Sequence, residues 1–542
     1  MGNKFATRRR GCGALVAVCV AIISTAVDAQ EAPLERIEAI ERQIRILQGE
    51  LKQLKNELGA AKQQLQQSRN ETQRAKEEAR QAREPAEQAP QDATKAATAE
   101  TLAAQSAAPA QAGVAAPRPA VAAAEGVQVG MHGGRPTIST SDGRLSFAIG
   151  TQVQFDMGTY FQNPLPTTQF PQLNNGVNLR RGRIFFVGRF DDFTLNITPD
   201  FGGSPDGSPT LYEANMNFTG FRPVTATVGY FKPWFSLYDS QSSNDFLLME
   251  RPSIIEISRN VAAGDARASV GAKASTDRYF ASWYMTGAPY GAQTASLLNG
   301  GQLSTVGRLA GRPFYDKDWN VHLDFSGEYV FHPNINANGM PGVSRTTFNL
   351  QDRPELRIDM NRLISTGNLS ISNVGVYGGE VGISWRNLLA LGGYYHIGET
   401  QAKLPGQPAP GLNFDGGYVE AGWVMTGEPI RYSVGSAAFA RPKVDDPLTV
   451  DERGIGAWEL AARWSVMNLN SNVTPGVPQS VTGGIYGGLQ QIFGAALSWY
   501  PNDWVRFYLQ FQYTQVDKLN SAGAAQIGQK FETLAGRMQV AF

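Results

Sequence analysis

Arginines gather in one short segment of the chain, and their spacing would let them bind anions. Residues 179–190 read LRRGRIFFVGRF. In an extended strand, side chains alternate between two faces, so Arg181, Arg183 and Arg189 share the face opposite the apolar residues. Strict alternation turns Arg180 away from Arg181 unless a bulge intervenes. Because a guanidinium fits phosphate oxygens as a planar fork, the segment predicts an anion ladder on one face of a strand.

The same arginines have a purely structural alternative. Other strands turn carboxylates to the same side, where they would neutralise the arginines as parts of a wall; the candidates are Glu213, Glu420 and Glu459. Arg463 lies two residues beyond Glu459 on one face of a strand, so these two could pair. Anion guidance and wall structure stay open as equal alternatives, and one arginine can serve both.

A second group of charges follows a strand that we expect to end near Phe231. The segment from Phe231 to about Asp265 is too long and irregular for a tight turn, and it carries Lys232, Arg251 and Arg259. Lys232 is the best candidate for a cation at a constriction, with an ordinary basic residue at a strand end as the alternative. Several acidic residues share the segment, which argues against a purely cationic constriction.

The overall composition excludes several kinds of partner and chemistry. The chain has 48 basic and 48 acidic side chains, whereas a nucleic-acid-binding protein is usually strongly basic. The region from residue 127 onward is also close to neutral, so any charge selectivity must come from local placement. The four histidines are scattered without metal-ligand spacing, and no catalytic constellation stands out. We expect neither an enzyme nor a bound cofactor or metal.

The N-terminus predicts export from the cytoplasm. Residues 1–29 combine basic residues, an apolar run from Cys12 to Ile23 and small residues at cleavage spacing, as in a secretory signal peptide. The apolar run is far shorter than the roughly 20 residues that a membrane-spanning helix needs. Both cysteines, Cys12 and Cys19, lie in this segment, so the mature chain has no thiol for a disulfide or a metal site.

Residues 34–84 predict an α-helical coiled coil. Their apolar residues repeat every seven positions, with Ile37 and Ile44 on one seam and Ile40 on the other. Isoleucine on both seams of the first heptad favours more than two strands, and a trimer is the expected state. A single solvated helix is the alternative. Residues 85–126 are rich in Ala and Pro and predict a disordered or extended linker.

From residue 127 to residue 542 the pattern is that of β-strands. Segments alternate apolar and polar side chains between Gly, Asn, Asp and Pro turns, most clearly at residues 504–516. Without a long apolar helix, a chain that crosses a membrane must do so as a closed sheet. Aromatic residues near the ends of runs, such as Trp504 and Tyr418, are typical of interfacial girdles, and Phe542 completes the outward face of the last strand.

These features favour a membrane barrel over a soluble sandwich. About 400 residues at roughly ten per tilted strand, with turns and loops, accommodate 16 strands, and 18 is the alternative. An even number puts both barrel ends on the same side of the membrane, so the coiled coil would lie in the periplasm. The predicted fold class is all-β: a 16-stranded antiparallel transmembrane β-barrel preceded by an α-helical coiled coil.

Four strings in this region resemble the phosphate-selective porin O/P family. They are LRRGRIFFVGRF at 179–190, VGYFKPWFSLYDSQSSNDFLLMERP at 228–252, GAWELAARWSVMNL at 456–469 and GGLQQIFGAALSWYPNDWVRFYLQFQYTQV at 487–516. The resemblance implies a trimeric barrel whose lumen is narrowed by inward-folded loops, with arginines and lysines guiding anions. It also implies that Arg180 and Arg181 match an arginine pair at the constriction, and that the segment after Phe231 sets the narrowest point.

The expected function is passive diffusion of small solutes, with anions such as phosphate as the best candidates, through a homotrimer embedded in outer-membrane lipid. The residues expected to line the pore and guide anions are Arg180, Arg181, Arg183, Arg189, Lys232, Arg251, Arg259 and Arg463. A general, non-selective pore is one alternative, because the region is nearly neutral and poor in the lysines on which the family's specificity partly depends. An envelope tether or adhesin is another, in which the coiled coil contacts the cell wall.

Overall fold

The structure is a computed structural model, and it describes most of the region that the sequence assigns to the barrel. The described residues are 126–162, 172–203, 209–290, 302–333, 347–402, 409–451 and 453–542. The predicted signal peptide (1–29), the coiled coil (34–84) and the linker (85–126), apart from its last residue, lie outside them. The domain boundaries therefore stay predictions.

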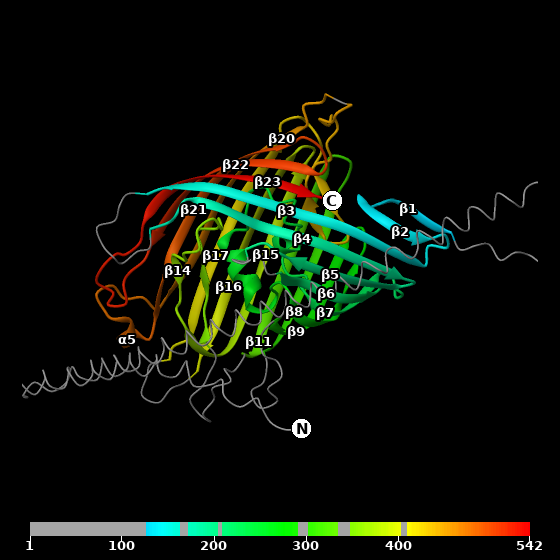
Figure 1. The fold of residues 1–542 in the computed structure, drawn as a ribbon. Helices are drawn as coiled ribbons and strands as arrows, with labels where there is room; N and C mark the ends of the chain where they lie inside the picture. Colours follow the sequence, from blue (N-terminus) through cyan, green and yellow to red (C-terminus); the bar gives the residue numbers. More distant parts are fainter. Residues whose placement is uncertain are drawn as a thin grey trace, which may run out of the picture. The chain divides into compact units, whose positions relative to one another are not determined.

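Sixteen strands among the described residues form one closed antiparallel barrel (Figure 1). Each strand pairs with the next of the set, and the last, β23, pairs with the first, β3, which closes the sheet. The predicted number of 16 is confirmed over 18. The strands are β3 (Leu145–Phe161), β4 (Gly176–Phe190), β5 (Phe193–Asp200), β6 (Thr210–Phe218), β7 (Val224–Phe231), β8 (Arg267–Ser275), β9 (Tyr279–Pro289), β10 (Leu303–Tyr315), β11 (Trp319–His332), β15 (Leu369–Trp385), β16 (Leu388–Gln401), β17 (Leu412–Val424), β20 (Ala457–Ser471), β21 (Ile485–Tyr500), β22 (Val505–Asp517) and β23 (Lys530–Ala541).

The strands form because their side chains alternate between apolar and polar, and the barrel separates the two sets. In β22, Phe507, Leu509 and Phe511 are exposed on the outer face, whereas Arg506 and Gln510 are fully buried inside. In a membrane barrel the outer face meets lipid, and the inner face meets water or inserted loops. The alternation predicted for this strand is confirmed.

The last strand closes the barrel with its apolar residues facing outward. Leu534, Met538 and Phe542 are all exposed on that side. The backbone of Phe542 exchanges two hydrogen bonds with that of Thr151 in β3, at N···O distances of 3.0 and 3.1 Å. The pairing of the first and last barrel strands therefore runs on to the final residue of the sequence.

Tryptophans gather on the outer face at the end of the barrel that carries Phe542. Trp319 and Trp385 stack there with ring centroids 5.8 Å apart, and Trp504 is also exposed at this end. Amphipathic rings at this level fit an interfacial girdle. The girdle prediction is wrong for Tyr418, which lies in the middle of β17 and is buried inside the barrel, because alternation decides which face a side chain takes.

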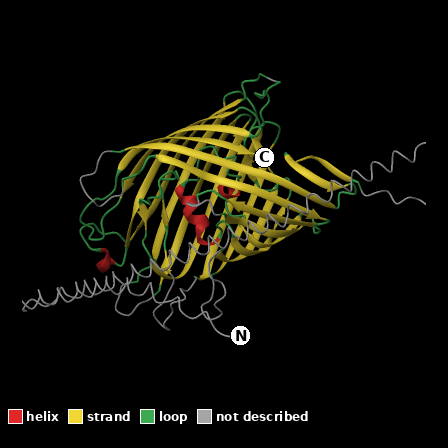
Figure 2. Cartoon of the chain, viewed as in Figure 1, coloured by secondary structure: helices red, strands yellow, loops and turns green. Residues whose placement is uncertain are grey.

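The two ends of the barrel differ in the length of their connections. At the end with Phe542, which we call the short-turn end, most turns are as short as Asp191–Asp192. At the opposite, long-loop end, two connections fold back into the barrel, residues 232–266 and 347–368 (Figure 2). We call residues 232–266 the constriction loop.

The constriction loop carries two helices inside the barrel, α3 (Leu237–Ser240) and α4 (Ser253–Ala262). Its apolar side chains pack against one side of the wall; the Phe235 ring, for example, lies 5.5 Å from that of Tyr395 in β16. This contact leaves the charged side chains of the loop facing the rest of the lumen. Among the described helices, none is long and apolar enough to cross a membrane.

One connection at the short-turn end is long and also folds into the barrel. It comprises residues 425–451 and 453–456, and we call it the short-turn insert. Its Phe439 is buried against β15, where a methyl group added to Gly382 would lie 2.3 Å from the ring. Arg308 of β10 donates to the backbone oxygens of Ser436 and Ala437 at 2.7 and 2.6 Å. The sequence analysis did not predict this insertion.

The remaining short elements belong to the inserted connections, precede the barrel or lie at its ends. The hairpin of β1 and β2 precedes the barrel, and β2 pairs with the beginning of β3. These elements are β1 (Val127–His132), β2 (Arg135–Thr140), β12 (Thr347–Phe348), β13 (Gln351–Asp352), β14 (Ile364–Ser365), β18 (Arg431–Ser433), β19 (Ala438–Ala440) and α5 (Gln479–Thr482).

Phe439→Ala should release the short-turn insert. Loss of a buried aromatic ring costs about 3–5 kcal/mol, so we expect a higher single-channel conductance and faster tryptic cleavage at Arg431 and Lys443. Val450→Ala, at a residue that is 99% exposed in the same insert, is the control. Wild-type conductance and cleavage rates in Phe439→Ala would show that the ring does not hold the insert.

Candidate functional site in the barrel lumen

A bulge in β4 turns two neighbouring arginines into the lumen. The register between β3 and β4 shifts at Arg180, while Arg181 stays paired with Gln154. A bulge leaves one residue outside the ladder and re-aims its side chain. Both Arg180 and Arg181 therefore point toward Glu250 of the constriction loop, with N···O distances of 2.7 and 3.8 Å.

Asp200, at the end of β5, holds the bulged segment in place. Its Oδ1 accepts hydrogen bonds from the backbone N–H groups of Gly182 and Gly202 at 3.1 and 2.9 Å. Its Oδ2 lies 2.7 Å from Nε of Arg183. The Arg183 guanidinium also lies 3.5 Å from the ring centroid of Tyr212. Arg183 is thus neutralised by Asp200, which was not among the carboxylates that the sequence suggested.

Glu250 lies at the centre of a cluster of four arginines. Arg180 holds its carboxylate as a fork, with Nε–Oε1 and Nη2–Oε2 distances of 2.7 and 3.0 Å. Arg537 of β23 approaches Oε1 to 2.6 Å, and Arg181 and Arg357 lie 3.8 Å away. We call these four arginines the arginine cluster. It joins the barrel wall to both inserted loops.

Two carboxylates of the constriction loop are buried and yet ionised. Burial would raise the pKa of Glu250, but Arg180 and Arg537 hold it well below its ordinary value. Burial opposes ionisation of Glu256 in the same way, and its neighbours, chiefly Arg357, lower the pKa of this carboxyl to about 2. Both groups are negatively charged at neutral pH.

Asp239 gathers the three cations that the sequence identified in the constriction loop. Its Oδ1 lies 2.6 Å from Arg259, 3.3 Å from Arg251 and 3.7 Å from Lys232. Lys232 also donates to the backbone oxygen of Asp239. Burial lowers the pKa of Lys232 to about 8, although Asp239 acts in the opposite direction. Asp265 pairs with Arg259 at 2.5 Å.

Arg463 is buried in an ion pair, but not with the residue that the sequence suggested. It contacts Glu355 of the inserted loop and lies 3.5 Å from Glu420 of β17. Glu459 instead pairs with Arg506 at 2.8 Å. The error arises because cross-strand and loop neighbours come closer than residues two positions apart on one strand.

A cavity of about 700 Å³ lies toward the short-turn end of the lumen, and we call it the basic vestibule. Seven basic side chains and four acidic ones line it. The basic residues are Arg135, Arg181, Arg183, Lys232, Arg251, Arg431 and Arg441, and the acidic residues are Glu213, Asp245, Asp265 and Asp503.

The sequence identified only part of this vestibule. It missed Arg135 of β2 and the two arginines of the short-turn insert, Arg431 and Arg441. Polar and apolar residues alternate in β2, and this pattern could have predicted that Arg135 faces the vestibule. Of the other predicted residues, Arg180, Arg259 and Arg463 are in the ion pairs described above, and Arg189 is exposed at the end of β4.

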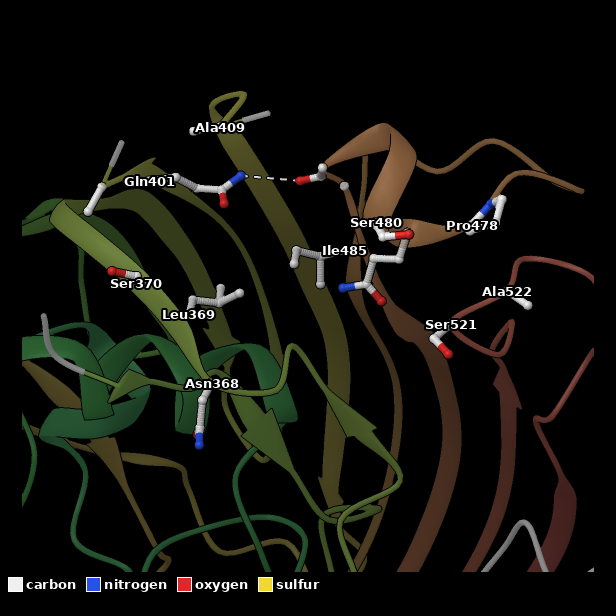
Figure 3. A pocket seen from close by; sticks show the side chains of 14 residues that line it. Asn368, Leu369, Ser370, Gln401, Ala409, Pro478, Ser480, Ile485, Ser521 and Ala522 are labelled. Carbon is white, nitrogen blue, oxygen red and sulfur yellow. Dashed lines mark hydrogen bonds between the residues drawn. The ribbon is translucent and has the colours of Figure 1, made fainter. Parts of the chain in front are cut away.

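A second cavity, of about 820 Å³, lies among the connections at the long-loop end, and we call it the outer pocket (Figure 3). None of its described lining residues is charged; they are small, apolar or amide- and hydroxyl-bearing. Gln401 joins two of the connections, since its Nε2 donates to the backbone oxygens of Gly483 and Pro410 at 3.2 and 2.9 Å. Among the described residues, basic side chains line the basic vestibule and not this pocket.

No metal site was found in the part of the chain that the structure describes, where no group of three or more His, Cys, Asp or Glu side chains is arranged to hold an ion. His322 is buried and contacts the hydroxyl of Tyr432 at 2.8 Å. Its place between the wall and the short-turn insert gives it a packing role.

Comparison with known proteins identifies relatives of the barrel region. The family model "Phosphate-selective porin O and P" matches residues 147–542. Porin O of Pseudomonas aeruginosa is 23% identical over 437 residues, which cover 75% of this chain and 90% of that protein. An uncharacterized protein of Caulobacter vibrioides is 26% identical over 300 residues, which cover 53% of each chain.

Three solved structures that match this chain are distant from it in sequence. An anion-selective porin from Comamonas acidovorans is 7% identical, with a TM-score of 0.42 over 73% of this chain and 100% of that one. The outer membrane channel DcaP of Acinetobacter baumannii is 10% identical, with a TM-score of 0.41 over 74% of this chain and 99% of that one. OmpT of Vibrio cholerae is 9% identical, with a TM-score of 0.41 over 74% of this chain and 98% of that one.

Any anion preference of the lumen should weaken as the pH rises from 7 to 9. Lys232 is mostly protonated below its pKa of about 8 and mostly neutral above it, so the vestibule loses a positive charge in this range. We expect the reversal potential in a salt gradient to shift toward zero, and to shift less in Lys232→Gln. Lys443→Gln, at an exposed lysine outside the vestibule, is the control. Equal pH shifts in wild type and Lys232→Gln would contradict this role.

Proposed function

The chain belongs to the phosphate-selective porin O and P family, and we propose that it lets small anions, phosphate among them, diffuse passively across the outer membrane. The coarser assignment, an outer-membrane porin, follows from the family and from the closed barrel. The preference for anions is the part that we propose.

The basic vestibule is the observation that carries this proposal. Its seven basic side chains exceed its four acidic ones, although the barrel region as a whole is close to neutral. Like charges gathered in a cavity with low-dielectric walls raise the local concentration of counter-ions. Arg183 and Lys232 contribute less to this excess, because Asp200 and Asp239 pair with them. Arg135 of the hairpin and Arg431 of the short-turn insert line the vestibule without an ion pair among the described residues, so they contribute to the excess most directly.

Discrimination between anions and cations would take place in the inner half of the pore. The outer pocket, whose described lining is uncharged, would admit solutes of either sign. Solutes that pass the constriction loop would then meet the vestibule. In outer-membrane barrels the short turns face the periplasm and the long loops face outward, so the basic vestibule would lie on the periplasmic side.

Most of the buried arginines support the wall in this proposal and do not bind the solute. Arg463 and Arg506 are buried in ion pairs with neighbouring carboxylates. Such pairs cost much free energy to separate. Arg135 and Arg431 line the vestibule outside such pairs, and they would be the side chains that a passing anion contacts in turn.

We further propose that the functional unit is a homotrimer. The heptads at residues 34–84 support this state, since isoleucine on both seams of the first heptad favours more than two strands. The coiled coil would extend into the periplasm, because both ends of a barrel with an even number of strands lie on one side.

The test is the selectivity of the refolded pore in a planar bilayer. Wild type should show a reversal potential of anion-selective sign in a chloride gradient, and phosphate should reduce the chloride current. Replacing both Arg135 and Arg431 with Gln should lower the anion-to-cation permeability ratio about twofold, as expected when ~0.4 kcal/mol of attraction is lost. The matched control replaces both Lys443 and Arg453 with Gln, which removes two positive charges at exposed residues outside the vestibule.

A cation-selective wild type would contradict the anion assignment and leave the porin fold untouched. An unchanged ratio in the double variant would show that the vestibule does not set the selectivity.

A further inference from the structure

The carboxylate of Glu250 occupies a place that would suit a free anion. Four guanidiniums from three parts of the chain converge on it: Arg180 and Arg181 from β4, Arg537 from β23 and Arg357 from the second inserted loop. The fork of Arg180 around the carboxylate has the geometry in which guanidinium binds carboxylate or phosphate oxygens. Glu250 therefore acts as the counter-ion of the cluster.

Glu250 belongs to the constriction loop and not to the barrel wall. Close to Glu250, two hydrogen bonds hold the backbone of this loop to the wall. The N–H of Met249 donates to Gln510 at 2.8 Å, and Arg463 donates to the backbone oxygen of Glu250 at 2.9 Å. The backbone is thus positioned independently of the Glu250 carboxylate, so a change of that side chain need not displace the loop.

The arginine cluster has more positive charge than its neighbouring carboxylates neutralise. Besides Glu250, Asp156 pairs with Arg537 at 2.6 Å, and Glu256 pairs with Arg357 at 2.6 Å. Four arginines thus face three carboxylates. In the described structure, the buried Nε groups of Arg181 and Arg357 have no hydrogen-bond partner. The three carboxylates therefore do not use all the donors of the cluster, and removal of the Glu250 charge would leave an excess of two positive charges.

We propose that Glu250 is a built-in competitor, a tethered carboxylate that keeps small oxyanions such as phosphate from binding tightly to the arginine cluster. This inference rests on the proposed function, because it concerns what limits the residence of an anion in the pore. A conducting site must bind its solute well enough to admit it and weakly enough to release it. Glu250 lowers the affinity of a site whose arginines alone would hold an oxyanion too long.

The test uses Glu250→Gln in the full-length refolded porin, with inorganic phosphate as the probe. The substitution keeps the shape of the side chain and removes its charge. The chloride current is recorded while phosphate is added, and the concentration that halves the current is compared with wild type. We expect that concentration to fall about tenfold, because phosphate then meets four arginines that only Asp156 and Glu256 neutralise.

Glu459→Gln is the matched control. Glu459 is as buried as Glu250, at 2% exposure each, and it pairs with a single arginine, Arg506, at 2.8 Å. Its substitution also adds one net positive charge to the lumen but removes no negative charge from the arginine cluster. The phosphate concentration for half-block should therefore stay near the wild-type value.

Two outcomes would overturn the proposal. An unchanged half-block concentration in Glu250→Gln would show that the carboxylate does not compete, and equal falls in Glu250→Gln and Glu459→Gln would assign the effect to net charge. If Glu250→Gln does not refold to a conducting pore, Glu250→Asp keeps the charge and withdraws it by one methylene. This variant should show an intermediate fall, and a wild-type value would refute the proposal.

The outcomes also separate this proposal from the proposed function. The wild-type reversal potential and the Arg135 and Arg431 variants test the vestibule alone. A wild type without anion preference, together with tight phosphate block in Glu250→Gln, would refute the proposed function and support the competitor. An anion-selective wild type whose half-block concentration does not change in Glu250→Gln would support the proposed function and refute the competitor.

Discussion

The pairing of buried charges is the constraint on which the interior of this barrel depends. A guanidinium in a filled lumen cannot stay unpaired without a large cost in free energy. The wall strands supply many arginines, and the inserted loops supply several of the carboxylates that neutralise them, such as Glu250 and Glu355. Loop placement and arginine placement therefore determine each other. The position of the constriction therefore depends on the wall arginines as well as on the constriction loop.

The constriction loop has an apolar side and a charged side, and the charged side pairs with the buried cations. One side is apolar and packs on the wall, as Phe235 does against Tyr395. The other side carries Asp239 and Glu250, which organise the cations around them. Hydrophobic contact fixes where the loop lies, and ion pairs fix how its charges are distributed. The remaining space becomes a vestibule in which basic residues prevail.

Much of the fold could be predicted because a barrel strand has a simple period. Alternation placed β22 and the exposed Phe542 correctly, and the strand number followed from length. The site was harder to predict. The bulge at Arg180 breaks the period, so its direction could not be read from alternation. The carboxylate partners of Arg183 and Arg463 depend on contacts between distant segments, and the short-turn insert has no periodic signal at all.

The seam between β3 and β23 has a consequence for the order of folding. The ion pair of Asp156 with Arg537 crosses this seam and joins residues 381 positions apart in the chain. Contacts between such distant positions form late, because chain entropy must be lost before they contribute. Closure of the barrel and burial of this pair are then one cooperative event. A barrel that has not closed would expose the unpaired backbone edges of β3 and β23, and with them Arg537 without its partner Asp156. These two features together distinguish the open barrel from the folded one.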